Sequence, residues 1–181
     1  MTIQETVVNK RRLFRSWPAA VVAAVVPLGA SGCTGGSTLP QHTITEHQAI
    51  TQAEQILRDT ASAITPRPTL ELSRLLTDTG PCLVDPTNTA DTRVQVSRAY
   101  YLRGFPRQGN ASVAQQVLAY WQHKGYAISD TQRMNGDTPA IHGATSSGDF
   151  TISLDTGGDG TLTIGATSPC LWPNGTPPAG S

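Results

Sequence analysis

The sequence predicts an α+β domain in which two helices pack on one face of an antiparallel sheet of about five strands, with one disulfide. Apolar residues recur at helical spacing in two segments, near residues 45–64 and 110–124. Residues 93–103 alternate between apolar and polar side chains, as a half-buried strand does. After Gly125, strand-like runs are separated by glycine-containing turns, which predicts an antiparallel meander.

The first helix is expected from Thr45 to Ile64. Thr45 and Gln48 have the spacing of a capping box, in which each side chain bonds the other residue's backbone. The residues that share one face of this helix are Ala49, Ile50, Ala53, Ile56, Leu57, Ala61 and Ile64. Two prolines, Pro66 and Pro68, then stop the helix. The apolar residues of segment 69–92 fit neither the helical nor the strand spacing well, so we expect a short strand followed by a loop.

The second helix is expected to begin at Asn110 or Ser112, with Ser112 and Gln115 as a second capping box, and to end at Gly125. Its apolar face comprises Val113, Ala114, Val117, Leu118 and Trp121. The last two strands each place apolar residues on one parity: Phe150, Ile152 and Leu154, then Leu162, Ile164 and Ala166. That face should pack on the helices, which leaves serine and threonine on the other face.

The N-terminus has the organisation of an export signal. Basic residues occur up to Arg15, the segment 18–30 is apolar, and small residues follow at Ser31 and Gly32. An apolar segment of about 13 residues is shorter than the roughly 20 that span a bilayer. We therefore expect residues 1–32 to be removed as a signal peptide, by the general or the twin-arginine route.

Cys33 directly follows this segment, and its placement resembles the lipobox of bacterial lipoproteins, although Ala30 stands where leucine is usual. The resemblance implies lipidation of Cys33 and attachment to the outer face of the cell membrane. An ordinary secretory signal is the alternative. Residues 33–43 are rich in Gly, Ser, Thr and Pro and predict a flexible tether. The domain is then expected to span 44–173, with a disordered tail at 174–181.

Composition excludes several classes of protein. The 181 residues include 13 basic and 13 acidic side chains, so the chain lacks the strong positive charge of nucleic-acid binders. A mean hydropathy of −0.22 excludes a polytopic membrane protein. With Cys33 set aside, Cys82 and Cys170 form an even pair in an exported chain, which predicts a disulfide between them. They lack the C-x-x-C spacing of a redox pair.

Three side chains are candidates for contact with a ligand or partner: Arg98, Tyr101 and Trp172. Arg98 shares the core-facing parity of its strand, so it either pairs internally, with Asp130 or Asp149 as candidate partners, or binds an anionic ligand. Tyr101 and Trp172 could line a groove for a glycan or lipid together with Trp121, Tyr126 and Tyr100. Packing of these rings in the core is the alternative.

The sequence indicates no catalytic residues, metal ligands or cofactor. The four histidines lack metal-ligand spacing, and no G-x-S-x-G or S-x-x-K motif set is present. We expect a non-catalytic interaction or accessory module of the cell envelope that binds an envelope protein and neither nucleic acid nor metal. The alternative is a carrier or sensor of a small apolar or glycan ligand, and an envelope enzyme ranks third.

Three motifs occur in order in the C-terminal half: Ser97–Gly104 (SRAYYLRG), Tyr120-Trp121 with Gly125-Tyr126, and Ser168–Pro173 (SPCLWP). In these motifs the chain resembles a group of small, uncharacterised lipoproteins of actinobacteria. The resemblance covers about residues 93–178. It implies an exported, disulfide-bonded lipoprotein and does not imply a particular activity.

Overall fold

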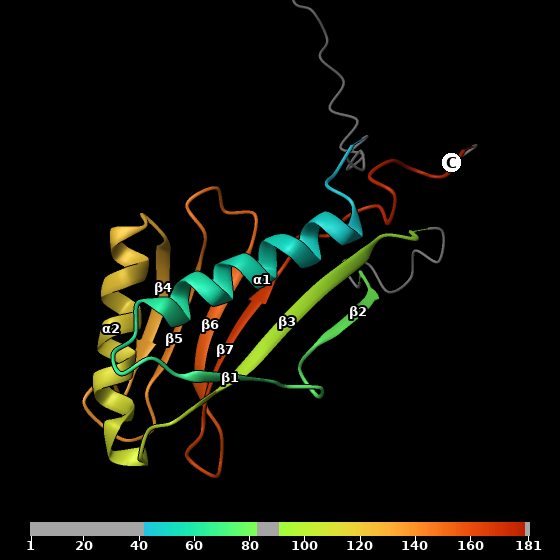
Figure 1. Ribbon diagram of the computed structural model, residues 1–181. Coiled ribbons are helices and arrows are strands. Elements are labelled where there is room, and N and C mark those ends of the chain that lie inside the picture. Colours follow the sequence, from blue (N-terminus) through green and yellow to red (C-terminus); the bar gives the residue numbers. More distant parts are fainter. Residues whose placement is uncertain (1–41, 83–90, 180–181) are drawn as a thin grey trace, which may run out of the picture. The chain divides into compact units, whose positions relative to one another are not determined.

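Two helices lie on the same face of a seven-stranded antiparallel sheet in the computed structural model, which describes residues 42–82 and 91–179 (Figure 1). The helices are α1 (Glu46–Ser62) and α2 (Asn110–His123). The strands are β1 (Thr69–Leu72), β2 (Asp78–Pro81), β3 (Val94–Arg103), β4 (Ala127–Gln132), β5 (Ala140–Ala144), β6 (Thr151–Thr156) and β7 (Leu162–Thr167). The predicted fold class is confirmed, and the strand count exceeds the expected number. The predicted signal peptide, Cys33 and most of the tether lie outside the described residues.

The sheet is ordered β1-β3-β7-β6-β5-β4, and β2 also pairs with β3. The long strand β3 therefore carries two short strands on one edge: β1 opposite Tyr100–Arg103 and β2 opposite Val94–Ser97. The sequence predicts one short strand and a loop in this region, and β2 was missed. Its sequence, Asp-Thr-Gly-Pro, has no apolar alternation, because β2 is held by backbone pairing and buries little of its own surface.

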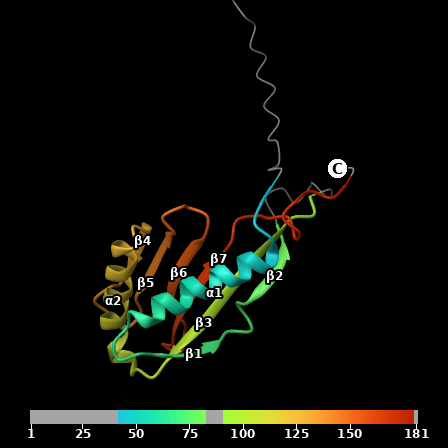
Figure 2. The same ribbon diagram turned by 45° about the horizontal axis from the view of Figure 1, so that its top comes forward.

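Helix α1 begins as the sequence predicts. The Thr45 side chain accepts a hydrogen bond from Gln48 N at 3.2 Å, and Gln48 Oε1 accepts one from Thr45 N at 2.9 Å. The buried face of α1 contains Ala49, Ala53, Leu57, Thr60 and Ala61. Small alanines at this contact let the helix lie close across β3 and β7, as Figure 2 shows.

Helix α2 begins at Asn110, and the predicted capping box at Ser112 is wrong. Asn110 is 3% exposed, and its amide donates to the carbonyls of Asp137 at 2.9 Å and Gly160 at 2.8 Å. The side chain therefore ties the helix start to two distant loops. These long-range contacts have no signature in the local sequence. The helix terminates before Gly125, whose φ of +71° is the left-handed conformation that glycine adopts at helix ends.

The meander β4–β7 confirms the predicted parity. The six apolar residues predicted to face the helices are each at most 3% exposed: Phe150, Ile152, Leu154, Leu162, Ile164 and Ala166. They join Trp121 and the buried face of α1 in one core. A bulge in β4 between Ile128 and Asp130 brings the Ala127 carbonyl over Gly143, where a Cβ would lie only 2.6 Å from that oxygen. Gly143 is thus required by the bulge.

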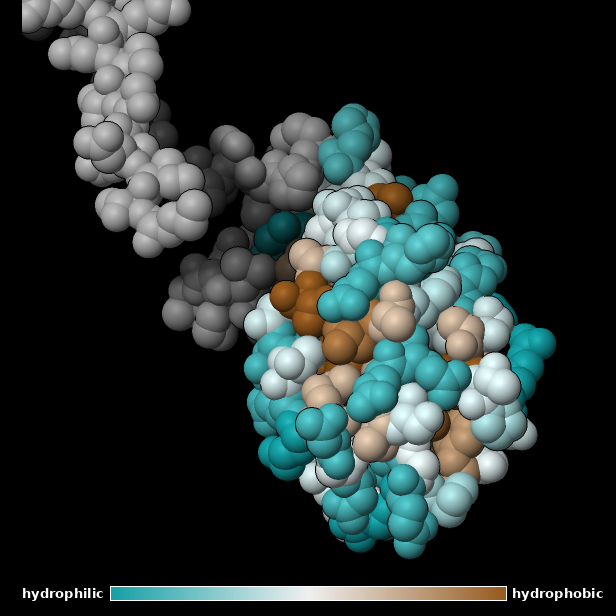
Figure 3. All heavy atoms as spheres, turned by 90° about the vertical axis from the view of Figure 1, so that its left-hand side faces the viewer, coloured by the Kyte–Doolittle hydropathy of each residue, from teal (hydrophilic) through white to brown (hydrophobic). Residues whose placement is uncertain are grey.

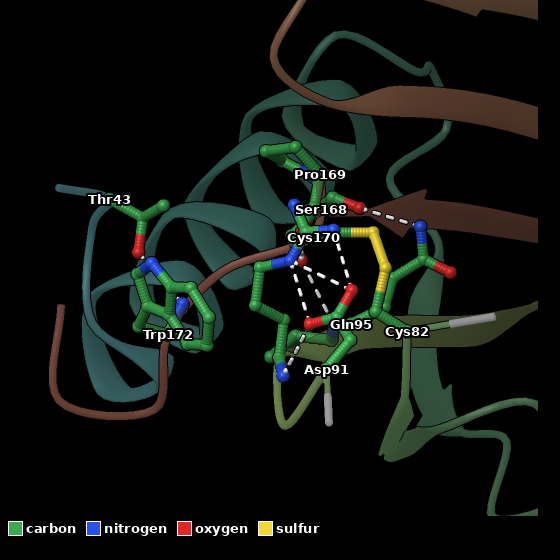
Figure 4. Close-up of a disulfide and its surroundings, with 10 residues drawn as sticks. Thr43, Cys82, Asp91, Gln95, Ser168, Pro169, Cys170 and Trp172 are labelled. Carbon is green, nitrogen blue, oxygen red and sulfur yellow. Dashed lines mark hydrogen bonds and ion pairs between the residues drawn. A yellow bond between two sulfur atoms is a disulfide. The ribbon is translucent and has the colours of Figure 1, made fainter. Parts of the chain in front are cut away.

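The predicted Cys82–Cys170 disulfide is confirmed, with 5.6 Å between the two Cα atoms. It lies beside a hydrogen bond from the Gln95 amide to the Ser168 carbonyl (Figure 4). Leu171 next to it exchanges two backbone hydrogen bonds with Val94, both of 2.9 Å. The bridge and these bonds attach the segment after β7 to the start of β3.

The chain on either side of the domain is also tied down. Thr43 N donates to the Gly175 carbonyl at 2.9 Å, Glu46 N donates to the Pro173 carbonyl at 3.0 Å, and Trp172 N donates to Thr43 Oγ1 at 2.8 Å (Figure 4). The predicted boundaries therefore need correction by one or two residues. Thr43 belongs to the domain rather than the tether, and Gly175, placed in the predicted tail, is bound to the segment before α1.

Replacing both Cys82 and Cys170 with serine should lower the free energy of unfolding by about 4 to 5 kcal/mol, because the bridge closes a loop with a sequence separation of 88. Urea unfolding followed by circular dichroism measures this. Reduced wild-type protein is the matched control and should show the same loss. An unchanged unfolding midpoint in both would contradict a stabilising role for the bridge.

Candidate functional site

The side of the sheet opposite the helices is lined by small and hydroxyl-bearing side chains. The registers place His142, Ser153, Gly165 and Ala99 side by side, on β5, β6, β7 and β3 in turn. This group is called the central row below. No helix in the described part of the chain covers this face, as Figures 1 and 2 show. Because side chains alternate along a strand, the face is independent of the apolar core beneath it.

Other side chains of the same face border the central row on both sides. The neighbours two positions away along the strands include Thr151, Thr167 and Ser97 on one side and Asp155, Thr163 and Tyr101 on the other. The result is a hollow of about 590 Å³ that runs across the strands. This hollow is called the trough. Its floor is low at Gly165, where a Cβ would lie 3.1 Å from the Ser153 Oγ.

The β5 end of the trough is polar. His142 Nε2 lies 3.0 Å from Asp155 Oδ1, and His142 Nδ1 lies 3.7 Å from Asp130 Oδ2. The Gln132 amide donates to the same Asp130 oxygen at 2.7 Å. This bond and the nearby imidazole lower the pKa of Asp130 below its ordinary value. The end of the trough therefore presents carboxylate acceptors, and it favours neutral or cationic groups over anions.

The opposite end of the trough is apolar and is formed by the loop between β1 and β2. Leu76 of this loop lines the trough. Ser73 N donates to the Ala99 carbonyl at 3.0 Å, and Ala99 N donates to Thr77 Oγ1 at 3.1 Å. These bonds take the place of strand pairing at residues 98–99 of β3, between the part that pairs with β2 and the part that pairs with β1. The loop is therefore fixed to β3 at both of its ends.

Arg98 pairs internally, on the helix side of the sheet. Its Nε lies 3.9 Å from Glu54 Oε1 of α1, and its Nη1 donates to the Ser97 carbonyl at 2.9 Å. The predicted candidate partners, Asp130 and Asp149, are wrong. Sequence reasoning missed Glu54 because the contact depends on how α1 crosses β3. With 15% of its side chain exposed, Arg98 does not present an open anion site.

The aromatic rings do not form a groove, and Trp121 and Trp172 are packed in the interior, which was the alternative. Trp121 is fully buried, and its indole N–H donates to Thr60 Oγ1 at 3.0 Å. Trp172 is 2% exposed and lies at the disulfide end of the domain, with the Arg93 guanidinium 5.8 Å from its ring. Tyr101 does face the trough side, where the Arg103 guanidinium lies 4.9 Å from its ring. The rings serve separate packing roles, so Tyr101 alone of the predicted contact residues borders the trough face.

Comparisons with protein-family models, with curated proteins and with solved structures found no match. Within residues 42–82 and 91–179, no helix is long and apolar enough to cross a membrane. The same residues contain no group of three or more His, Cys, Asp or Glu side chains that could hold a metal ion. Viewed from the α2 side, the surface is largely hydrophilic, with small apolar patches between polar side chains (Figure 3).

The Tyr100 hydroxyl on the helix side of β3 provides a test of this geometry. It donates to both oxygens of Glu54, at 2.7 and 2.8 Å, and desolvation by burial, followed by the Glu54 hydrogen bond, raises the pKa of Tyr100 to about 12. Because the folded-state pKa lies above the unfolded value of about 10, this contribution to stability is complete below pH 10 and is lost as the pH rises towards 12.

Tyr100→Phe should therefore cost about 1 to 2 kcal/mol of unfolding free energy at pH 7 and progressively less above pH 10. Urea unfolding across this range measures the difference. The absorbance titration at 295 nm should lose one late-titrating tyrosine in the variant. Glu54→Gln is the matched control and should lower the pKa of Tyr100. An equal cost of Tyr100→Phe at every pH would refute the assignment.

Proposed function

We propose that this protein is an exported lipoprotein of the cell envelope, anchored through Cys33, that acts without catalysis as an interaction module. The observation that carries the proposal is the trough, a hydroxyl-lined hollow on the sheet face that the described helices leave bare. The protein that binds there is an envelope partner. The module holds it near the membrane, where the anchor keeps the domain.

The chemistry of the trough supports binding of a polypeptide segment. The hydroxyl groups of Ser153, Thr151 and Thr167 can both donate and accept hydrogen bonds. They can therefore bond the N–H groups and the carbonyl groups of a bound polypeptide. Gly165 and Ala99 leave room for side chains between these hydroxyls. The carboxylates of Asp130 and Asp155 at one end favour a partner segment with a basic or neutral residue there.

The alternative is a carrier or sensor of a small ligand. The trough volume of about 590 Å³ lies within the range of roughly 300 to 1,000 Å³ of ligand pockets and favours this reading. The aromatic groove that the sequence suggested no longer supports it, because Trp172 is buried. A neutral glycan would suit the hydroxyls and carboxylates better than an apolar ligand.

The anchor is tested by Cys33→Ala in the native host. Wild-type protein should partition into the detergent phase and carry the added mass of acyl chains, because two chains are needed for stable attachment. The variant should lack the added mass. Thr34→Ala, one residue along, is the matched control and should behave as wild type. Unmodified wild-type protein in the medium would favour the ordinary secretory signal.

The trough is tested with a photo-crosslinking amino acid at Thr151, on the open face, and at Gln52, exposed on α1. We expect a reproducible envelope protein crosslinked from position 151 and not from position 52. Gly165→Val raises the floor of the trough and should reduce the product at least about tenfold, since burial of complementary groups is lost. Gly158→Val, at a site with no atom within 4 Å of the new Cβ, is the matched control.

Equal crosslinking from positions 151 and 52, or no effect of Gly165→Val, would contradict the use of the trough for a protein partner. Native mass spectrometry of the protein from its own envelope separates the alternative. A small co-purifying mass that leaves on denaturation and is absent from Gly165→Val would favour the carrier.

A further inference from the structure

The end of β1 and the loop that follows it expose three leucines. Leu72 is 43% exposed, Leu75 is 86% exposed and Leu76 is 51% exposed, and these are the exposed large apolar side chains among the described residues. Leu72 ends β1, and the other two lie in the loop that closes one end of the trough. Leu72 pairs with Tyr100 and so shares the helix side of the sheet, whereas Leu76 lines the trough on the open side. Exposed apolar side chains therefore occur on both sides of this edge of the sheet, within one short segment, and such a group indicates a contact surface.

The backbone presents these leucines in a fixed position. Ser73 is fully buried, and its N–H donates to the Ala99 carbonyl. Leu76 N donates to the Ser73 carbonyl at 3.2 Å, which makes a turn, and Thr77 Oγ1 accepts from Ala99 N. Both ends of the loop are bound to β3, so its backbone is already ordered. Binding of a partner to the exposed leucines therefore costs little conformational entropy of the loop.

The charged side chains around these leucines are of both signs. Asp78, at the start of β2, is exposed, and its carboxylate accepts a hydrogen bond from Thr79 N at 2.8 Å. Arg74 is exposed between the leucines and places a cation among them. Glu71 beside it is paired with Arg103 at 2.8 Å, and this pairing lowers the pKa of Glu71, so its charge is compensated. Exposed leucines with a cation between them suit the interface of a bilayer that contains anionic phospholipid.

The length of chain outside the described structure brings a bilayer within reach. Thr43, where the domain begins, is ten residue steps after Cys33, and this length of chain spans at most about 33 to 36 Å when fully extended. A domain of this size has a radius of gyration of about 14 Å. An anchored domain therefore stays within about its own diameter of the membrane, and the effective concentration of the surface is about millimolar. A weak contact is then sufficient to fix its orientation.

We propose that Leu72, Leu75, Leu76 and Arg74 form a membrane-contact loop that enters the interface of the outer leaflet and orients the anchored domain. The occupant of this surface is the phospholipid bilayer itself. This inference rests on the proposed lipid anchor. Because Leu76 also lines the trough, the contact places the apolar end of the trough at the bilayer surface and turns its His142 end away.

The test uses the full lipidated protein on phospholipid vesicles, labelled with an environment-sensitive fluorophore at Leu75→Cys. The same label at Gln52→Cys, on the exposed side of α1, is the matched control. A quencher attached to the lipid acyl chains should quench the label at position 75 about threefold more than the label at position 52. The difference should increase when anionic phospholipid is added, and Arg74→Gln should remove that increase.

A second variant excludes insertion driven by the fluorophore. Leu72→Ser with Leu76→Ser, in the Leu75→Cys background, should abolish the excess quenching, while circular dichroism remains that of the folded protein. Equal quenching at positions 75 and 52 in protein that floats with the vesicles would overturn the proposal. Protection of position 75 by a bound protein instead of lipid would also overturn it.

Failure of the anchor is distinguishable from failure of the loop. If the wild-type protein does not float with vesicles, the anchor proposal fails. The quenching comparison is then made with a histidine tag in place of the residues before Thr34, bound to vesicles through chelating lipids. Excess quenching at position 75 in that arrangement would support the loop on its own, and equal quenching would reject it.

Discussion

Side chains along β3 alternate between the helix side of the sheet and the open side. Even-numbered residues such as Val96 and Leu102 are buried beneath α1, and odd-numbered residues such as Ser97 and Ala99 face the trough. A shift of one residue in register would exchange the two sets and expose the core. The pairing of β3 with β7 therefore determines the core and the candidate binding surface together.

Charge is arranged differently on the two sides of the sheet. Beneath α1, the Glu54 carboxylate is paired within the domain with Arg58, Arg98 and the Tyr100 hydroxyl. On the open side, Asp130 and Asp155 flank a single histidine and remain partly exposed. The first arrangement stabilises the contact of helix and sheet, whereas the second leaves acceptors that a ligand or partner can use. This asymmetry supports the assignment of binding to the open face.

The two ends of the described domain meet at one place. Thr43, the first residue of the domain, is bonded to Trp172 and Gly175, close to the Cys82–Cys170 bridge. The chain before Thr43 thus joins the domain beside the disulfide and not at the trough. If the domain is anchored at Cys33 as proposed, it can turn about this attachment point, and the proposed contact at the leucine loop would orient it.

The fold class, both helices, β3, the four-stranded meander and the disulfide could be predicted from the amino-acid sequence, because each depends on a local period, a turn or the small number of cysteines. The remaining features depend on contacts between distant segments of the chain. Strand β2 has no local signal, Arg98 meets Glu54 through the crossing angle of α1, and Trp172 is buried by segments far away in the chain. The trough has the same origin. Its central row joins residues of four strands, and their lateral order is set by pairing between segments that the local sequence does not specify.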